Sequence, residues 1–245
     1  GNWNNCVSGV GPPAGTPGPG NIAQITNGTV NLPAGAVTVA GLALSGGILQ
    51  GPGALTVTGN FAWSGGILRG DGSSLPITIQ AGALANVSND PELDNRRLIV
   101  DGTLNMLSPS VADQGRFRFS NGAILQNRGL VRLETDEGLR SLRCGTPSND
   151  CGSISNDSGA IFRLRAGPSA TGVAIEAQLT SFDNNGTVEL LGGCATLGAP
   201  GSDTTGSYVL NGSCRLSIAP FPGEERVIDT GVAFSGSSSL RLAGA

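Results

Sequence analysis

The sequence predicts an all-β chain wound as a β-solenoid, in which each coil rests on the coil before it. The first indication is a repeated block, because Leu44-Ser-Gly-Gly-Ile-Leu49 recurs with one change as Trp63-Ser-Gly-Gly-Ile-Leu68. A period near 20 residues, built from short strand patterns between turns, is typical of solenoids. The second indication is composition, since 40 glycines with only 4% aromatic and 13% charged residues are unusual for a globular enzyme.

Apolar and polar residues alternate within each repeat. In Val37-Thr-Val39, Leu55-Thr-Val57 and Ile77-Thr-Ile79, the apolar residues share one face of a strand and the threonine lies on the other. A single coil cannot bury its apolar row, so we expect the next coil to cover it, with Leu44 against Trp63 and Val39 against Val57. At roughly 20–25 residues per coil the chain makes about ten coils. We expect residues 21–245 to form one solenoid domain.

The chain begins with a segment that does not fit the repeat. Residues 1–20 are rich in glycine and proline, and proline cannot donate to a strand ladder. We interpret this segment as an irregular arm or cap. Strand patterns begin at 22–25 and 29–32 and continue to about residue 107. The polar segments 86–97 and 108–114 are expected to be loops that leave the coil.

After residue 115 a different pattern accompanies longer coils. The pattern consists of an apolar residue, then an asparagine near a glycine, then an alternating strand. It recurs around Asn127, Asn156 and Asn185. One asparagine per coil at the same corner predicts a ladder of side-chain amides that hydrogen-bond between coils. The alternative is that Asn-Gly simply marks turns.

The five cysteines favour an oxidising, extracellular setting. Cys144 and Cys151 flank a turn-rich segment whose ends could meet, and Cys194 and Cys214 are about one coil apart. We therefore predict the disulfides Cys144–Cys151 and Cys194–Cys214. Cys6 is left over, as an intermolecular thiol or a buried free thiol. The alternative is that all five are reduced.

Several functions are excluded by missing residue types. The chain has no histidine and no lysine, and all 14 basic residues are arginine. Ser-His-Asp and Cys-His nucleophiles, a phosphate-loop lysine and a Schiff base therefore cannot form. A formal charge of −4 without basic clusters argues against nucleic acid, and no apolar run is long enough to cross a bilayer. We expect no cofactor and no metal.

The acidic clusters do not predict catalysis. Asp90/Glu92/Asp94, Asp136/Glu137 and Glu224/Glu225 fall in expected loops, whereas a glycosidase needs two carboxylates across a groove. We interpret them as solvated charge and assign no catalytic residue.

Arginines two apart on expected strands are candidates for binding anionic glycans. Their aromatic or aliphatic neighbours, such as Phe117 and Leu164, lie on the opposite face of the strand. If these arginines stack as a ladder on the outer surface of the solenoid, their bidentate contacts could hold sulfate or carboxylate groups. The alternative is that they pair with carboxylates such as Glu134 or Glu189. The candidates are Arg116, Arg118, Arg132, Arg163 and Arg165.

Threonine offers another candidate surface. Thr38, Thr56 and Thr78 predict an outward row of the kind that flat ice-binding faces use. The ordinary preference of threonine for strands explains the row equally well.

The repeat resembles the secreted right-handed parallel β-helices of bacterial surface proteins, of the filamentous-haemagglutinin and autotransporter-passenger type. The resemblance covers residues 21–245 and is carried by the segments 55–68 and 182–190. It implies a right-handed parallel β-helix and a non-enzymatic adhesive or fibre-building role at the cell surface. An alternative is a carbohydrate-binding or carbohydrate-cleaving β-helix.

The end of the sequence adds an expectation about partners. Its last strand pattern, near 234–242, is followed by no charged cap. An open solenoid end is a template for another strand, so we expect a homo-oligomer or filament through the solenoid ends, and surface glycans are a further candidate partner.

Overall fold

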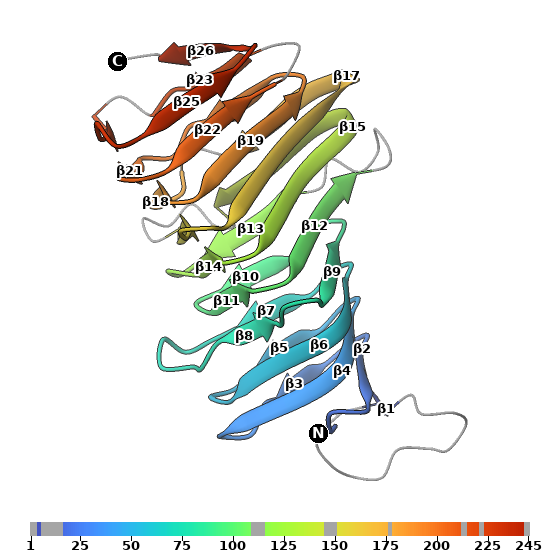
Figure 1. Ribbon diagram of the computed structural model, residues 1–245. Helices are drawn as coiled ribbons and strands as arrows, with labels where there is room; N and C mark the ends of the chain where they lie inside the picture. The colour runs from blue at the N-terminus through green and yellow to red at the C-terminus, as the bar shows by residue number, and fades with distance from the viewer. Residues whose placement is uncertain are drawn as a thin grey trace.

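The computed structural model describes residues 4–5, 17–108, 116–144, 151–175, 178–211, 215–220 and 223–242. In these residues the secondary structure consists of strands, and the pairings between them are parallel apart from that of β1 (Asn4–Asn5) with β2. Figure 1 shows the strands stacked one above another from the N-terminal end to the C-terminal end. The chain is therefore all-β with parallel sheets, an arrangement consistent with a parallel β-helix.

Most of the strands form three ladders, in which strands of successive layers pair with each other. The first ladder contains, in order, β2 (Ile22–Ile25), the second half of β4 (Ala36–Leu44), the second half of β6 (Ala54–Trp63), β9 (Leu84–Val87), β12 (Thr103–Ser108), the start of β15 (Leu130–Cys144), the start of β17 (Ile161–Ile175), β19 (Thr187–Gly192), β22 (Ser207–Leu210) and β25 (Ala233–Gly236).

The second ladder lies on another side of the stack. It contains β3 (Thr29–Asn31), β5 (Ile48–Gln50), β7 (Ile67–Arg69), β10 (Glu92–Asp94), β13 (Arg116–Ser120), the ends of β15 and β17, β20 (Ala195–Leu197), β23 (Arg215–Ile218) and β26 (Ser239–Leu242).

The third ladder completes each layer. It contains the starts of β4 and β6, β8 (Ile77–Ile79), β11 (Arg97–Val100), β14 (Ile124–Asn127), β16 (Ser153–Asn156) and β18 (Ser181–Asn184). Two further strands, β21 (Gly201–Asp203) and β24 (Arg226–Ile228), pair with each other beyond it. The chain thus visits the first, second and third ladder in turn and then begins the next layer.

The register confirms the predicted stacking of the first repeats. Leu44 pairs with Trp63, and Val39 pairs with Val57. These four side chains are fully buried, because the alternation places them on the inner face of their strands. Phe61 stacks on Trp63 with ring centroids 5.6 Å apart, and Phe117 meets Trp63 edge-on at 5.1 Å. One hydrophobic core runs through the stack.

Glycine permits the close approach of successive corners. A Cβ on Gly47 would lie 2.5 Å from Gly28 O, and one on Gly66 would lie 2.7 Å from Gly47 O. Both glycines also have positive φ, of 73° and 77°, which L-residues seldom adopt. The Gly-Gly pairs of the repeat are thus required where one corner rests on another.

The prediction that 86–97 is a loop leaving the coil is wrong. Glu92–Asp94 forms β10, which pairs with β7 below and β13 above. Asn86 belongs to β9, and Arg97 begins β11. Leu93 is fully buried, so this one apolar residue holds a short strand in the core despite its polar neighbours. The other expected loop, 108–114, lies outside the described residues apart from Ser108, which ends β12.

Candidate functional site

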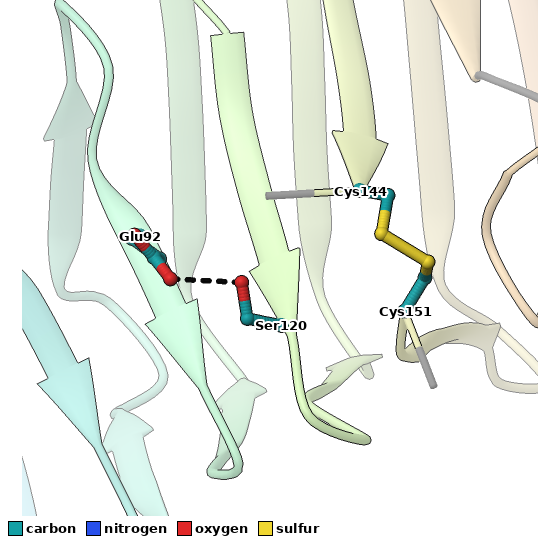
Figure 2. The surroundings of a disulfide bond; sticks show 4 residues. All are labelled: Glu92, Ser120, Cys144 and Cys151. Atoms are coloured by element: carbon teal, nitrogen blue, oxygen red, sulfur yellow. Dashed lines mark hydrogen bonds between the residues drawn. A yellow bond between two sulfur atoms is a disulfide. The ribbon is translucent and has the colours of Figure 1, made fainter. Parts of the chain in front are cut away.

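A disulfide joins Cys144 and Cys151, as the sequence predicts. Figure 2 shows the bond at the end of β15, beside β13, where Ser120 donates a hydrogen bond to Glu92. The two Cα atoms are 5.0 Å apart, within the range that a disulfide spans. Cys194 is also disulfide-bonded. Its predicted partner, Cys214, and the remaining Cys6 lie outside the described residues.

A ladder of buried asparagines runs along the third ladder of strands. Asn127 Nδ2 donates to Asn156 Oδ1 at 2.7 Å, and Asn156 Nδ2 donates to Asn184 Oδ1 at 2.7 Å. The Nδ2 groups of Asn127, Asn156 and Asn184 also donate to the carbonyls of Ile161, Thr187 and Ser207, respectively. All three amides are fully buried. Asn127 and Asn156 each donate both to the next amide and to a carbonyl of the next layer, and Asn184 ends the ladder with a bond to a carbonyl alone.

The assignment of Asn185 to this ladder is wrong, because Asn184 occupies that position. Asn156 pairs in register with Asn184. Asn185, one residue later, is only half-buried and accepts a hydrogen bond from the Thr204 hydroxyl. Spacing to glycine does not distinguish the two asparagines, since Asn127 and Asn184 lie two residues before a glycine but Asn156 lies three residues before Gly159.

The five candidate arginines lie on two different ladders. Arg116 and Arg118 are in β13 of the second ladder, whereas Arg132, Arg163 and Arg165 are in β15 and β17 of the first. The expectation that they form a single outward row is therefore wrong. Arginine side chains stack only where their strands pair, and Arg132 pairs in register with Arg163.

The arginines of the first ladder form ion pairs with glutamates on the same surface. Arg132 makes a two-pronged contact with Glu134, at 2.8 and 3.2 Å. Arg165 lies 3.4 Å from the same carboxylate, and Arg163 lies 2.8 Å from Glu189. This is the arrangement that the sequence offered as the alternative to glycan binding. The arginine side chains are partly exposed, whereas the Glu134 side chain is only 7% exposed, so the buried carboxylate is neutralised by partners that remain in contact with solvent.

Arg118 and Asp90 form a separate pair on the second ladder, 2.8 Å apart. Burial raises the pKa of Asp90, but hydrogen bonds from the Arg116 amide and the Arg118 guanidinium, with the charges of both arginines, outweigh it. The pKa of Asp90 is therefore below its ordinary value.

Arg96 is a buried cation that sequence reasoning missed. Its Nη1 donates to the carbonyls of Gly51 and Arg69, and its Nη2 donates to those of Gly53 and Leu75. These carbonyls belong to two successive corners below Arg96. Burial lowers the pKa of Arg96 to about 10, and the charge of Asp71 opposes this shift. A planar guanidinium can bond several carbonyls at once, so Arg96 ties three layers together.

A second buried cluster, also missed, lies near the C-terminal end. Arg226 bonds both carboxylate oxygens of Asp203, and the Tyr208 hydroxyl donates to Asp203 Oδ2 at 2.8 Å. The backbone N–H of Asn184 also donates to Asp203 Oδ1, which connects the cluster to the asparagine ladder. Burial raises the pKa of Asp203 although Arg226 opposes it, and burial also raises the pKa of Tyr208. No sequence signal relates three residues so unlike in type and spacing.

The other predicted surfaces are limited in extent. Thr38, Thr56 and Thr78 pair in register, but Ile99 and Gln126 continue the same column. Threonine therefore occupies only three layers of this face. In the described ranges, no three His, Cys, Asp or Glu residues gather as a metal ion would require. Over the same ranges, no helix is long and apolar enough to span a membrane.

Several apolar side chains of the last described strands are exposed or only partly buried. Phe234 and Leu242 are 42% and 64% exposed. Ile228, Val232 and Leu240 are only partly buried. Exposed apolar clusters on soluble proteins commonly mark interaction sites.

Comparisons with protein-family models, curated proteins and solved structures give no significant match to this chain.

Proposed function

We propose that the chain is a right-handed parallel β-helix, a solenoid of about ten coils, that serves as a non-enzymatic structural subunit or stalk of an extracellular surface fibre. The observation that carries this proposal is the unbroken column of parallel pairings in the first and second ladders, from the N-terminal to the C-terminal layer. Each layer buries its apolar row on the next, as a solenoid requires.

The interior provides the stiffness that a stalk needs. Backbone hydrogen bonds follow the stacking direction, and the amides of Asn127, Asn156 and Asn184 add a side-chain ladder parallel to them. Arg96 and Arg226 bond carbonyls and carboxylates of neighbouring layers. Bending or shearing the stack would break several of these bonds at once.

The outer surface suits a structural role outside the cell. Arg132, Arg163 and Arg165 are engaged with Glu134 and Glu189, so these carboxylates serve to hold arginines. The Cys144–Cys151 disulfide supports an oxidising compartment. The resemblance of the repeat to bacterial surface β-helices is what suggests a fibre.

Single-molecule force spectroscopy tests the mechanical role, with handles at the two ends of the stack. Pairing registers place successive layers from 18 residues apart, at Ala36 and Ala54, to 33 apart, at Leu142 and Ile175. A stalk should resist force and lengthen in steps of one or a few layers, each about 60–110 Å of extended chain. Extension without resistance would contradict the proposal. Antibody labelling of intact source cells tests the extracellular location, and labelling only after lysis would contradict it.

A second candidate function is binding of sulfated or carboxylated glycans to the outer face of the first ladder. It is favoured by the partial exposure of Arg132 and Arg165, whose side chains are 33% and 43% exposed beside their glutamate partners. A glycan array tests it with the Arg163→Ala variant and, as a matched control on the second ladder, Arg118→Ala. Binding lost only in Arg163→Ala supports this function. An array without hits removes it.

A further inference from the structure

We propose that a cavity beside the starts of β8, β11 and β14 binds a carboxylated sugar unit, with Arg97 as the residue that holds the carboxylate. The cavity has a volume of about 300 Å³ and lies on the outer face of the third ladder. Pockets that hold small molecules have volumes of this size and larger. The inference goes beyond the proposed stalk function and does not depend on it.

One wall of the cavity is the loop between β7 and β8. This corner contains seven residues, 70–76, whereas there are three residues between β5 and β6 and two between β10 and β11. The longer loop therefore projects from the stack, and Figure 1 shows it beside β8. Residues of the next two layers, among them Asn95 and Gly122, line the opposite side of the cavity.

Hydrogen bonds fix this loop to the layers above it. The Gly72 amide donates to the side-chain oxygen of Asn95 at 3.0 Å, and the Asn95 side chain donates to the Asn121 carbonyl at 3.1 Å. Farther along the loop, the Leu75 carbonyl accepts a hydrogen bond of 2.8 Å from Arg96 Nη2. The cavity is therefore preformed, and a ligand would bind without the cost of ordering the loop.

Two arginines give the cavity a positive charge. Among the described residues, neither Arg96 nor Arg97 forms a salt bridge. Arg97 is exposed, whereas Arg96 is 2% exposed and its Nε has no hydrogen-bond partner. The carboxylate of Asp71 acts on Arg96 through its charge, but it accepts hydrogen bonds from the hydroxyls of Ser73 and Ser74 and lies outside the lining of the cavity. Two positive charges against one negative charge favour an anion.

The position of Arg97 defines how the anion would be held. Arg97 pairs in register with Ile124, and its neighbour Leu98 pairs with Ile77, so Arg97 follows Pro76 in the same outward column. A guanidinium can donate two parallel hydrogen bonds to one carboxylate. Arg97 can make this contact without giving up another carboxylate, because it has no ion pair to break.

The rest of the lining suits a sugar ring. Leu75 on the loop is 47% exposed, and Pro76 and Ile124 are half-buried, so the three can cover the C–H face of a ring. The Ser74 hydroxyl also lines the cavity and can accept a hydrogen bond from a sugar hydroxyl. An inorganic anion would leave this apolar lining uncovered, and a neutral sugar would leave Arg97 without a partner.

Isothermal titration calorimetry of the intact chain tests the ligand class. The probes are methyl glucuronide and its neutral match, methyl glucoside. We expect saturable binding of the glucuronide with a dissociation constant on the order of 1 mM, and roughly tenfold or more weaker binding of the glucoside. No saturable binding of the glucuronide, or equal affinity for the two probes, would overturn the proposal. Equal affinity for sodium sulfate would also overturn it, because charge alone would then be recognised.

Variants test the role of Arg97. Arg97→Gln should weaken glucuronide binding about tenfold or more, and Arg97→Lys, which keeps the charge but not the planar fork, should weaken it less. Arg97 is exposed, so both variants should keep the circular dichroism of the original chain. The matched control is Arg128→Gln, which removes a 46% exposed arginine just after β14 and should leave the constant within about twofold. Equal losses in Arg97→Gln and Arg128→Gln would overturn the assignment.

An oligosaccharide with an internal glucuronate unit distinguishes the source of the ligand. Binding at least as tight as that of methyl glucuronide would show that the cavity accepts a unit within a polysaccharide chain. Much weaker binding would show that it accepts a chain end or a free sugar acid. Either result supports the site, provided that Arg97→Gln abolishes it.

Discussion

Asn127 and Asn156, 29 residues apart in the chain, share a buried hydrogen bond of 2.7 Å between their side-chain amides. Asn156 repeats the contact with Asn184 in the next layer. Each amide thus fixes the register of two successive layers. An amide that is fully buried must find partners or lose stability, so the ladder selects one stacking of these layers over any displaced one.

Removing the middle amide should therefore destabilise the fold. Asn156→Ala leaves a donor of Asn127 and the Oδ1 of Asn184 without partners, which costs about 2–5 kcal/mol in the free energy of unfolding. Urea denaturation measures the loss. Asn185→Ala, at the half-buried corner position, is the control and should cost less than about 1 kcal/mol. Equal losses in the two variants would contradict the assignment of Asn184 to the ladder.

Arg96 should be the arginine on which stability depends most. Arg96→Met removes four hydrogen bonds from a charged donor to carbonyls. The variant also no longer has to bury a charge, but this gain in free energy offsets only part of the loss. We expect a decrease of about 3 kcal/mol or more in the free energy of unfolding. The adjacent Arg97→Ala, at an exposed position, should change it by about 0.5 kcal/mol or less. A stable Arg96→Met variant would show that the three-layer contact is dispensable.

Tyr208 is the chain's single tyrosine, so phenolate absorbance reports on it alone. Burial and the partner Asp203 raise its pKa in the folded state. The unfolded chain therefore releases this proton first, near pH 10, and the contribution of Tyr208 to stability is lost as pH rises above that value. Phenolate absorbance should appear only as the protein unfolds, whereas the urea-unfolded chain should titrate near pH 10. Titration near pH 10 with unchanged circular dichroism would contradict the buried cluster.

The pair formed by Asp90 and Arg118 predicts a pH effect of opposite sign. Because the pKa of Asp90 is depressed in the folded state, the ionised carboxylate stabilises the fold at pH values above the ordinary pKa of an aspartate. This stabilisation is lost as pH falls through the folded-state pKa. Arg118→Gln should raise the Asp90 pKa toward the ordinary value, as followed by carboxyl NMR. Arg97→Gln should leave it unchanged. An Asp90 pKa insensitive to Arg118 would show that the Arg116 amide and charge alone hold it low.

Period-two alternation was enough to predict the core of the first layers. Leu44 and Trp63 are paired because the repeat keeps both the spacing and the inner face, and these features are visible in a single sequence. Short strands are harder, and β10 was missed because Leu93 is its sole fully buried apolar residue among polar neighbours. The conformation of such a strand is determined by backbone pairing with the strands on both sides, and the local sequence pattern does not indicate this pairing.

The polar interior was predictable only where it repeats. The asparagine ladder is visible in the sequence as a periodic pattern. The prediction has one error, Asn185 for Asn184, because two asparagines are adjacent at this position and the pattern was aligned on the second. Arg96 and the Asp203–Tyr208–Arg226 cluster occur once each. Their partners are backbone carbonyls or residues of other layers, so their positions follow from the folded register and not from spacing. The grouping of the candidate arginines failed for the same reason, because ladder membership decides which of them meet.

Distances between spin labels on the outer face of the third ladder test the stacked arrangement most directly. Thr38, Thr56, Thr78, Ile99, Gln126, Ser155 and Asp183 form one column of register partners. At about 4.8 Å per layer, labels at Thr38 and Gln126 should lie about 19 Å apart, and labels at Thr38 and Asp183 about 29 Å apart. Distances that grow by one layer spacing at each step would support the stack. Distances that fail to increase along the column would contradict it.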